Sequence, residues 1–259
     1  MSLTTGKRLL AIAVLAAVAG ASTLFASNSW GNYHWARTAN PFTLKTGDNV
    51  DAKWDAYLDL AIGDWTASTV LDLAKVAGGS NPKNCRPTSG RIEVCNSTYG
   101  SNGWLGLAQI WASGSHITQA VSKLNDTYFN TAKYNTPAWR SLVMCQEIAH
   151  DFGLDHQDVA FDNPNLGSCM DYTSNPSGPP SNEHPNAHDY DQLVTIYGGH
   201  LDSTTTISQT TNRGAAASQL DHGQFGKLIR STNGGRTELY VLDLGNDEKV
   251  FTHVIWAEY

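Results

Sequence analysis

The sequence predicts an α+β fold in which a few helices pack on a mixed β-sheet. Three stretches carry apolar residues at helical spacing, at 50–68, 139–152 and 186–197. Between and after them lie short runs rich in Val, Ile, Leu and Trp, separated by Gly, Asn and Pro, a pattern typical of strands and turns. A hydrophobic fraction of 41% with eight Trp in 259 residues supplies enough apolar side chains for a sizeable core.

Composition excludes two classes of protein. Aromatic residues make up 10% of the chain, which argues against a disordered protein. The formal net charge is -7, from 24 acidic and 17 basic residues. A general surface that neutralises phosphates requires the opposite balance, so no nucleic-acid partner is expected.

The first residues are typical of a secretory signal peptide. Lys7 and Arg8 precede an apolar run at 9–19, and small residues follow it. Cleavage is expected between Ala21 and Ser27, which makes 1–26 the signal peptide and the mature protein secreted, extracellular and free of the membrane. An uncleaved anchor over 9–26 is the alternative, although Gly20 and its polar neighbours weaken that span.

Four cysteines, an even number, predict two disulfides in an exported protein. Cys85 and Cys95 bracket a polar loop, which makes a local bridge between them the natural pairing. Cys145 and Cys169 are then left to each other. A structural zinc held by four thiolates is disfavoured because no C-x2-C spacing occurs.

The elements of the main part of the chain can be assigned in order. A short strand at 42–45 leads to Asp48, which offers an N-cap for the helix at 50–68. Further strands are expected at 69–76, 91–97, 104–113 and 116–124, the last being either a continuation of its predecessor or a separate strand. Pro137 suits the first turn of the helix at 139–152, and Gly153 ends it.

The last third of the chain is predicted to contain a long loop, a helix, a linker and an extension. The loop covers 167–183, and the helix at 186–197 is closed by Gly198 and Gly199. Residues 202–222 are read as a Ser/Thr-rich linker, and 223–259 as a small β-meander with strands at 227–231, 237–242 and 249–256. A segment this short does not readily build a core of its own. The meander should therefore pack on the main domain or on a partner.

The most informative stretch runs from Cys145 to Asp158. On a helix, Gln146 and His150 lie one turn apart on the same face, as two ligands of one ion must. Glu147 lies beside them, where it could take a proton from a metal-bound water. Gly153 lets the backbone leave the helix, and the turn can bring back His156 as a third ligand.

This stretch resembles the metzincin zinc peptidases, whose pattern is H-E-x-x-H-x-x-G-x-x-H followed by a methionine turn. Glu147, His150, Gly153 and His156 match the pattern, and Met170 within S-C-M-D-Y looks like the methionine turn. The resemblance covers roughly 30–199 and leaves the C-terminal meander outside. It implies a twisted mixed sheet with an active-site helix and a C-terminal helix, in a catalytic domain at 27–201.

The resemblance also implies a set of roles. Zn²⁺ would be held by Gln146, His150 and His156, with Glu147 as general base. Met170 would lie under the metal, and Tyr172 would bind the metal or stabilise the oxyanion. The strand at 104–113 would be an edge strand that pairs with an extended peptide or protein substrate. A monomer is expected.

Gln146 departs from the family pattern, which has a histidine there. Its amide oxygen could ligate zinc more weakly than imidazole. Alternatively Gln146 is a bystander and Asp155 or Asp158 supplies the ligand, or the site has lost its metal. Two functions follow: a secreted zinc metalloendopeptidase, or a catalytically inactive secreted binding protein that keeps the metzincin fold.

Overall fold

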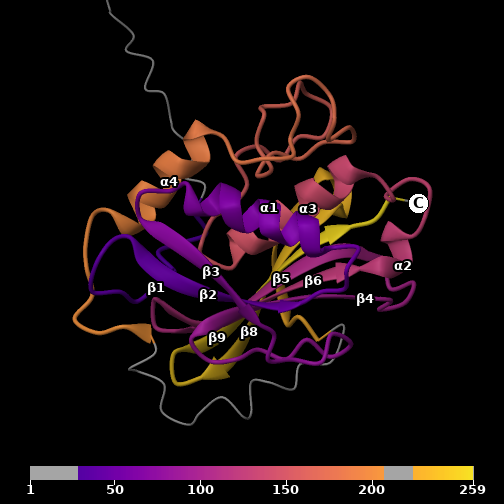
Figure 1. The fold of residues 1–259 in the computed structure, drawn as a ribbon. Helices are drawn as coiled ribbons and strands as arrows, with labels where there is room; N and C mark the ends of the chain where they lie inside the picture. The colour runs from indigo at the N-terminus through magenta and orange to yellow at the C-terminus, as the bar shows by residue number, and fades with distance from the viewer. Residues whose placement is uncertain (1–28, 207–223, 259) are drawn as a thin grey trace, which may run out of the picture.

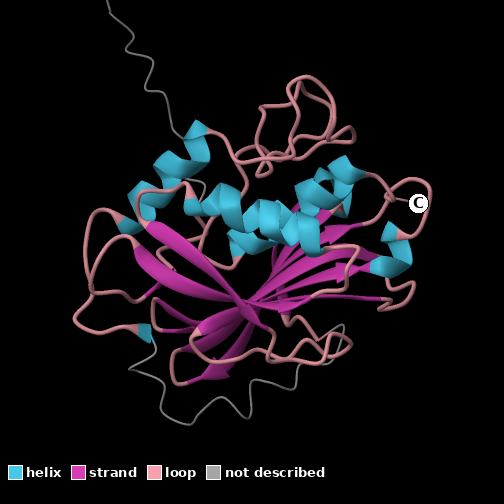
Figure 2. Ribbon diagram, in the orientation of Figure 1, coloured by secondary structure: helices cyan, strands magenta, loops and turns pink. Residues whose placement is uncertain are grey.

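The computed structural model describes residues 29–206 and 224–258 and confirms the α+β class. The helices gather on one side of a strongly twisted sheet, as Figures 1 and 2 show. The predicted signal peptide and most of the predicted linker lie outside the described residues. None of the helices within 29–206 and 224–258 is long and apolar enough to cross a membrane.

The elements follow the predicted order with few changes. The strands are β1 (His34–Trp35), β2 (Phe42–Asn49), β3 (Leu71–Ala77), β4 (Arg91–Ser97), β5 (Trp104–Ser113), β6 (His116–Asn125), β7 (Lys227–Thr232), β8 (Thr237–Gly245) and β9 (Glu248–Trp256). The helices are α1 (Asp55–Thr66), α2 (Asp126–Phe129), α3 (Pro137–His150) and α4 (Ala187–Tyr197). Residues 116–125 form a separate strand, because Gly114 turns the chain back with a φ of 59°.

One capping assignment was wrong. Asp48 does not cap the first helix, because β2 continues through Asn49 and pairs with both β3 and β4 along that length. The Asp48 carboxylate instead accepts a hydrogen bond from the Val50 amide at 3.2 Å. Helix α1 therefore begins only at Asp55, after Trp54.

The sheet has a parallel half and an antiparallel half. Its strand order is β3-β2-β4-β6-β5-β9-β8-β7, with β1 paired beside β6. The pairs from β3 through β6 are parallel, and the pairs from β6 through β7 are antiparallel. Helix α3 packs against β5 and β6 and against α1, so it lies over the middle of the sheet.

The C-terminal meander is part of this sheet. Strand β9 pairs antiparallel with β5 along nearly its whole length, from Trp104 opposite Trp256 to Ser113 opposite Glu248. The expectation that 104–113 is an edge strand was therefore wrong. The family pattern does not include the meander, so it gives no indication of this pairing. Without the meander, β5 would have unpaired backbone groups on one side, and β9 pairs with them.

Both predicted disulfides are confirmed. Cys85 is bonded to Cys95 on the face of the sheet away from α3, where they pack with Trp111, Val121 and Val250. Cys145 is bonded to Cys169, which ties α3 to the turn that carries Met170.

Helix α3 is defined by its two ends. The Thr136 side chain accepts a hydrogen bond from the Trp139 amide at 3.3 Å, and Pro137 occupies the first turn. After His150 the chain turns at Gly153, where φ is 98° and a Cβ atom would lie 2.5 Å from the Tyr33 carbonyl oxygen. Only glycine fits there, so this residue directs the chain toward His156.

Candidate metal centre

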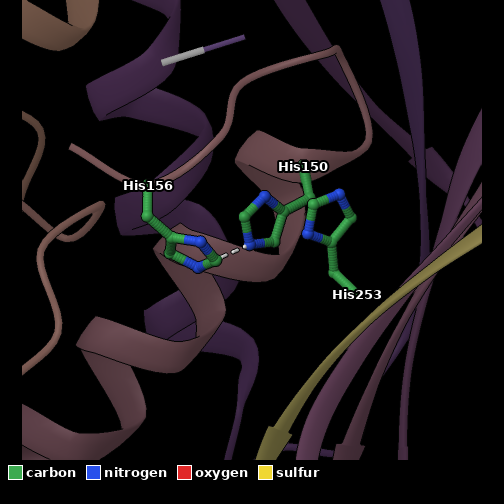
Figure 3. A group of neighbouring side chains, drawn as sticks. All are labelled: His150, His156 and His253. Atoms are coloured by element: carbon green, nitrogen blue, oxygen red, sulfur yellow. Dashed lines mark hydrogen bonds between the residues drawn. The ribbon is translucent and has the colours of Figure 1, made fainter. Parts of the chain in front are cut away.

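The last turn of α3, the loop that follows it and strand β9 converge on one buried point. Three histidines meet there, His150, His156 and His253, and their ligand atoms all lie within 4.8 Å of one another (Figure 3). Gln146, Glu147 and His150 come from α3, and each is only 1% exposed. The sequence motif thus brings Gln146, Glu147, His150 and His156 to the same end of one helix.

The hydrogen bond of His150 determines which of its ring nitrogens is free. Its Nδ1 lies 2.8 Å from the Leu154 carbonyl oxygen. A carbonyl can only accept, so Nδ1 carries the proton and Nε2 presents a lone pair. Burial, together with the neighbouring His253 and His156, lowers the pKa of His150 and keeps the ring neutral.

His156 is oriented in the same way by a carboxylate. Its Nδ1 lies 3.2 Å from Asp155 Oδ1, which leaves its Nε2 as a second lone pair. That atom lies 3.1 Å from the Nε2 of His150. Two lone pairs in contact repel each other unless a cation lies between them. Ligand nitrogens around a tetrahedral zinc lie about 3.3 Å apart, so the spacing fits this ion.

The sequence gives no sign that His253 belongs to this centre. Strand β9 places it opposite Ala108 of β5 and Leu239 of β8. Its ring stacks on His150 with a centroid distance of 4.0 Å and an interplanar angle of 10°. Its Nε2 is buried without a hydrogen-bond partner, and burial lowers its pKa to about 3. It is therefore a third neutral donor aimed at the same region.

Gln146 is held so that its amide oxygen has no partner. The Gln146 Nε2 donates to the Cys169 carbonyl oxygen at 2.9 Å, and its Oε1 is buried without any hydrogen bond. A buried acceptor without a donor costs free energy, of order 1–3 kcal/mol. A cation within reach of this oxygen would remove that cost, and the three neutral histidine donors fit a bound zinc.

Glu147 carries a second unpartnered oxygen. Its Oε2 is buried without a hydrogen bond, and burial together with the nearby Asp151 raises its pKa well above the usual value. Gly106 of β5 makes room for it, because a Cβ atom there would lie 2.7 Å from the Glu147 carboxylate. A buried carboxyl group with a raised pKa, on the helix that also carries His150, suits proton transfer.

Tyr172 and Met170 come from the turn that the disulfide holds. The Tyr172 ring stacks on His156 at a centroid distance of 4.1 Å. Burial raises the pKa of its hydroxyl, which is hydrogen-bonded to Thr237 of β8. Met170 is fully buried in the core and contributes packing there.

The two aspartates considered as ligands have other partners. Asp155 forms a two-point ion pair with Arg230, at 2.5 and 2.7 Å, and its Oδ1 also accepts from the His156 amide. Asp158 accepts hydrogen bonds from the Ala160 amide and the Asn163 side chain. Asp155 thus orients His156 from behind, while Asp158 shapes the loop.

Strands β7, β8 and β9, which make up the C-terminal meander, cover the centre. Each contributes a contact: Arg230 to Asp155, Thr237 to Tyr172, and His253 to His150. Arg236, between β7 and β8, lies over the Phe161 ring at 3.4 Å from its centroid. A substrate therefore cannot pair with β5 while β9 is in place.

Comparisons with known proteins find only distant similarity. No protein-family model matches the chain, and no curated protein does. Among solved structures, myroilysin is similar at a TM-score of 0.36 and 13% identity, over 68% of this chain and 98% of that one. High choriolytic enzyme 1, a hatching enzyme zinc-protease from Oryzias latipes (medaka fish), is similar at 0.34 and 11%, over 64% of this chain and 95% of the other.

Proposed function

We propose that the protein is a secreted zinc-dependent peptidase whose metal is held by His150 and His156, with Gln146 and His253 as further donors. The observation that carries this proposal is the contact of the His150 and His156 lone pairs at 3.1 Å, at the end of the helix that also carries the unpartnered carboxylate oxygen of Glu147. The metzincin-like motif in the sequence supports the same assignment.

The chemistry would divide among the residues of α3 and the methionine turn. When bound, zinc lowers the pKa of its water and polarises a carbonyl group. Glu147 would take the proton from the attacking water and pass it to the leaving amine. The Tyr172 hydroxyl, once released from Thr237, would donate a hydrogen bond to the oxyanion of the tetrahedral intermediate. The substrate would be an extended peptide or protein.

A catalytically silent binding protein is the second candidate. The observation that favours it is the pairing of β9 with β5, because this leaves the backbone groups of β5 without room for a peptide. If the protein is such a binding protein, the metal would stabilise the fold, and the C-terminal meander would stay in place permanently.

Glu147→Gln separates the two candidates. The peptidase proposal predicts that the variant keeps its zinc, measured by metal analysis, and loses casein hydrolysis by several orders of magnitude, because the proton-transfer step fails. Glu248→Gln, at the turn between β8 and β9, is the matched control and should keep both properties. Zinc-loaded wild-type protein that shows no hydrolysis, and whose chelator treatment changes only stability, would favour the binding protein.

A further inference from the structure

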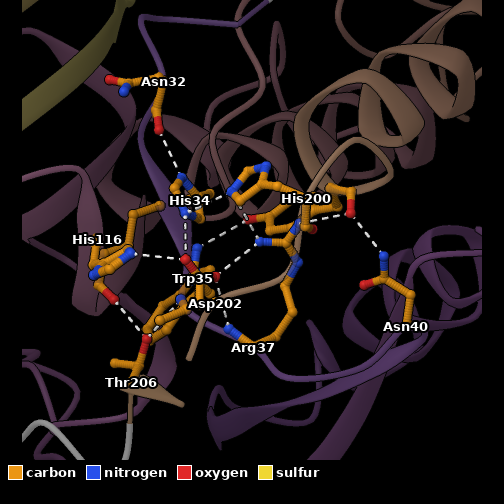
Figure 4. Close-up of polar contacts among 12 residues, drawn as sticks. Asn32, His34, Trp35, Arg37, Asn40, His116, His200, Asp202 and Thr206 are labelled. Atoms are coloured by element: carbon orange, nitrogen blue, oxygen red, sulfur yellow. Dashed lines mark hydrogen bonds and ion pairs between the residues drawn. The ribbon is translucent and has the colours of Figure 1, made fainter. Parts of the chain in front are cut away.

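A second group of histidines lies outside the centre described above. His34 of β1, His116 at the start of β6, and His200 and Asp202 after α4 come together at one edge of the molecule (Figure 4). The ligand atoms of His34, His116 and Asp202 all lie within 4.8 Å of one another. None of these residues takes part in the peptidase chemistry proposed above.

His34 presents a lone pair to this group. Its Nδ1 lies 2.7 Å from the Asn32 carbonyl oxygen, which places the proton on Nδ1. The Nε2 of a neutral His34 ring is therefore an acceptor. It lies 3.5 Å from Asp202 Oδ1 and 3.2 Å from His200 Nε2. His200 Nε2 is in turn within 3.4 Å of Arg37 Nη1, a group that can only donate.

These contacts bring acceptors against one another. The Nε2 lone pair of a neutral His34 ring faces the Oδ1 carboxylate oxygen of Asp202. His116 Nε2 lies 3.1 Å from the same Asp202 Oδ1. The separations of 3.1 and 3.5 Å from Asp202 Oδ1 to the two histidines bracket the ligand spacing of about 3.3 Å around a tetrahedral zinc. A cation among His34 Nε2, His116 Nε2 and Asp202 Oδ1 would replace the repulsion between the His34 lone pair and the carboxylate oxygen by bonds to the ion.

The surroundings hold the donors in place. Asp202 Oδ2 is bound by the Arg37 amide at 3.1 Å and by Arg37 Nη1 at 3.0 Å, so Oδ1 is directed at the histidines. The His34 ring is nearly perpendicular to the rings of His116 and His200, at 88° and 85°. Partners behind a ligand that fix its orientation are characteristic of metal sites.

We propose that His34, His116 and Asp202, whose ligand atoms all lie within 4.8 Å of one another, form a second zinc site. These three donors would leave one position of a tetrahedral ion for water. The described residues contain no free cysteine, so imidazole and carboxylate are the donors at hand. The ion would join three segments that are distant in the sequence: the entry to β1, the β5–β6 turn and the chain after α4.

The alternative is a protonated His34 in a metal-free network with Asp202 and Arg37. Equilibrium dialysis of the full chain against Zn²⁺ alone distinguishes the two. The proposal predicts two bound zinc ions per wild-type chain, one in His116→Ala, one in His150→Ala and none in the double variant. His184→Ala, an exposed histidine outside both groups, is the control and should keep both ions.

One zinc per wild-type chain, unchanged in His116→Ala and lost in His150→Ala, would overturn the second site and leave the peptidase centre intact. One zinc per wild-type chain that is lost only in His116→Ala would support the second site and overturn zinc binding at the proposed peptidase centre. If His116→Ala does not fold, histidine side-chain NMR of the wild-type chain decides. Zinc addition should then leave the His34 ring neutral and shift its Nε2 signal. A doubly protonated His34 ring whose signals do not change on zinc addition would overturn the proposal.

Discussion

Gln146 is the single side chain that would most affect the strength of the proposed zinc site. Its amide is oriented by the Cys169 carbonyl, so the oxygen is presented without a partner. An amide oxygen is a weaker zinc donor than imidazole, and His253 supplies an additional nitrogen from a distant strand. In the proposed zinc site the weakness of one donor would thus be offset by another that the motif does not contain.

Gln146→His should tighten zinc binding, because a stronger donor replaces the amide oxygen, and Gln146→Ala should weaken it. The change should exceed the roughly 10- to 100-fold effects of residues that only orient ligands. Competition with a chromophoric chelator measures all three affinities. His253→Ala should weaken binding as well. Equal affinities for wild type and both Gln146 variants would show that Gln146 is not a ligand.

Lys123 of β6 is a charged residue inside the sheet and is only 4% exposed. Burial lowers its pKa from 10.5 to about 8. Between these pH values the unfolded chain binds more protons, so stability rises with pH there. Below pH 8 the folded protein bears the full cost, about 3 kcal/mol for a shift of this size.

Lys123→Met should therefore stabilise the protein most below pH 8, and the gain should shrink toward pH 10.5. Urea midpoints at a series of pH values measure this. Lys53→Met, an exposed position before α1, is the control and should show no such pH dependence. A gain that is the same at every pH would contradict a buried ammonium as its cause.

At the scale of elements, the contact between α3 and β5 determines where Glu147 lies. Gly106 lets the helix approach the strand, since a Cβ atom would meet Val143 Cγ1 at 2.6 Å and the Glu147 carboxylate at 2.7 Å. The helix could not come so close over a larger residue. The strand thus positions the proposed general base through the absence of a side chain.

Gly106→Ala should destabilise the protein by about 1–3 kcal/mol through overpacking, and should displace Glu147. Gly63→Ala in α1 is the matched change, because nothing lies within 4 Å of its Cβ position. That variant should gain up to about 1 kcal/mol from lower chain entropy in the unfolded state. Urea unfolding measures both, and equal effects would refute the packing argument.

At the scale of the whole molecule, the strands of the C-terminal meander and those of 29–206 form one continuous sheet. The meander contributes His253 to the candidate metal centre and covers it through Thr237 and Arg236. If the protein is a peptidase, these contacts hold it in a closed state. Opening then requires β9 to separate from β5.

Arg236→Ala should favour opening without changing a metal donor. It removes the contact over Phe161, for which a cation–π interaction of about 1–2 kcal/mol predicts a roughly 5-fold or larger rise in the open population. Hydrogen exchange of the β9 amides and casein hydrolysis should both become faster. Lys227→Ala, exposed on β7, is the control. Faster exchange with unchanged hydrolysis would show that the C-terminal meander does not control access to the site.

The sequence alone determined the local structure and the chemistry of the motif. Strands β4 and β5, helix α3 with its glycine exit and both disulfides follow from periodicity, turn residues and cysteine count, which act over a few residues. The tertiary structure decided how β9 pairs with β5, and with it the place of His253 and the closure of the centre. It also brought His34 to His116 and Asp202. Such contacts depend on which open strand edge and which distant segments meet in space, and no spacing in the sequence records that.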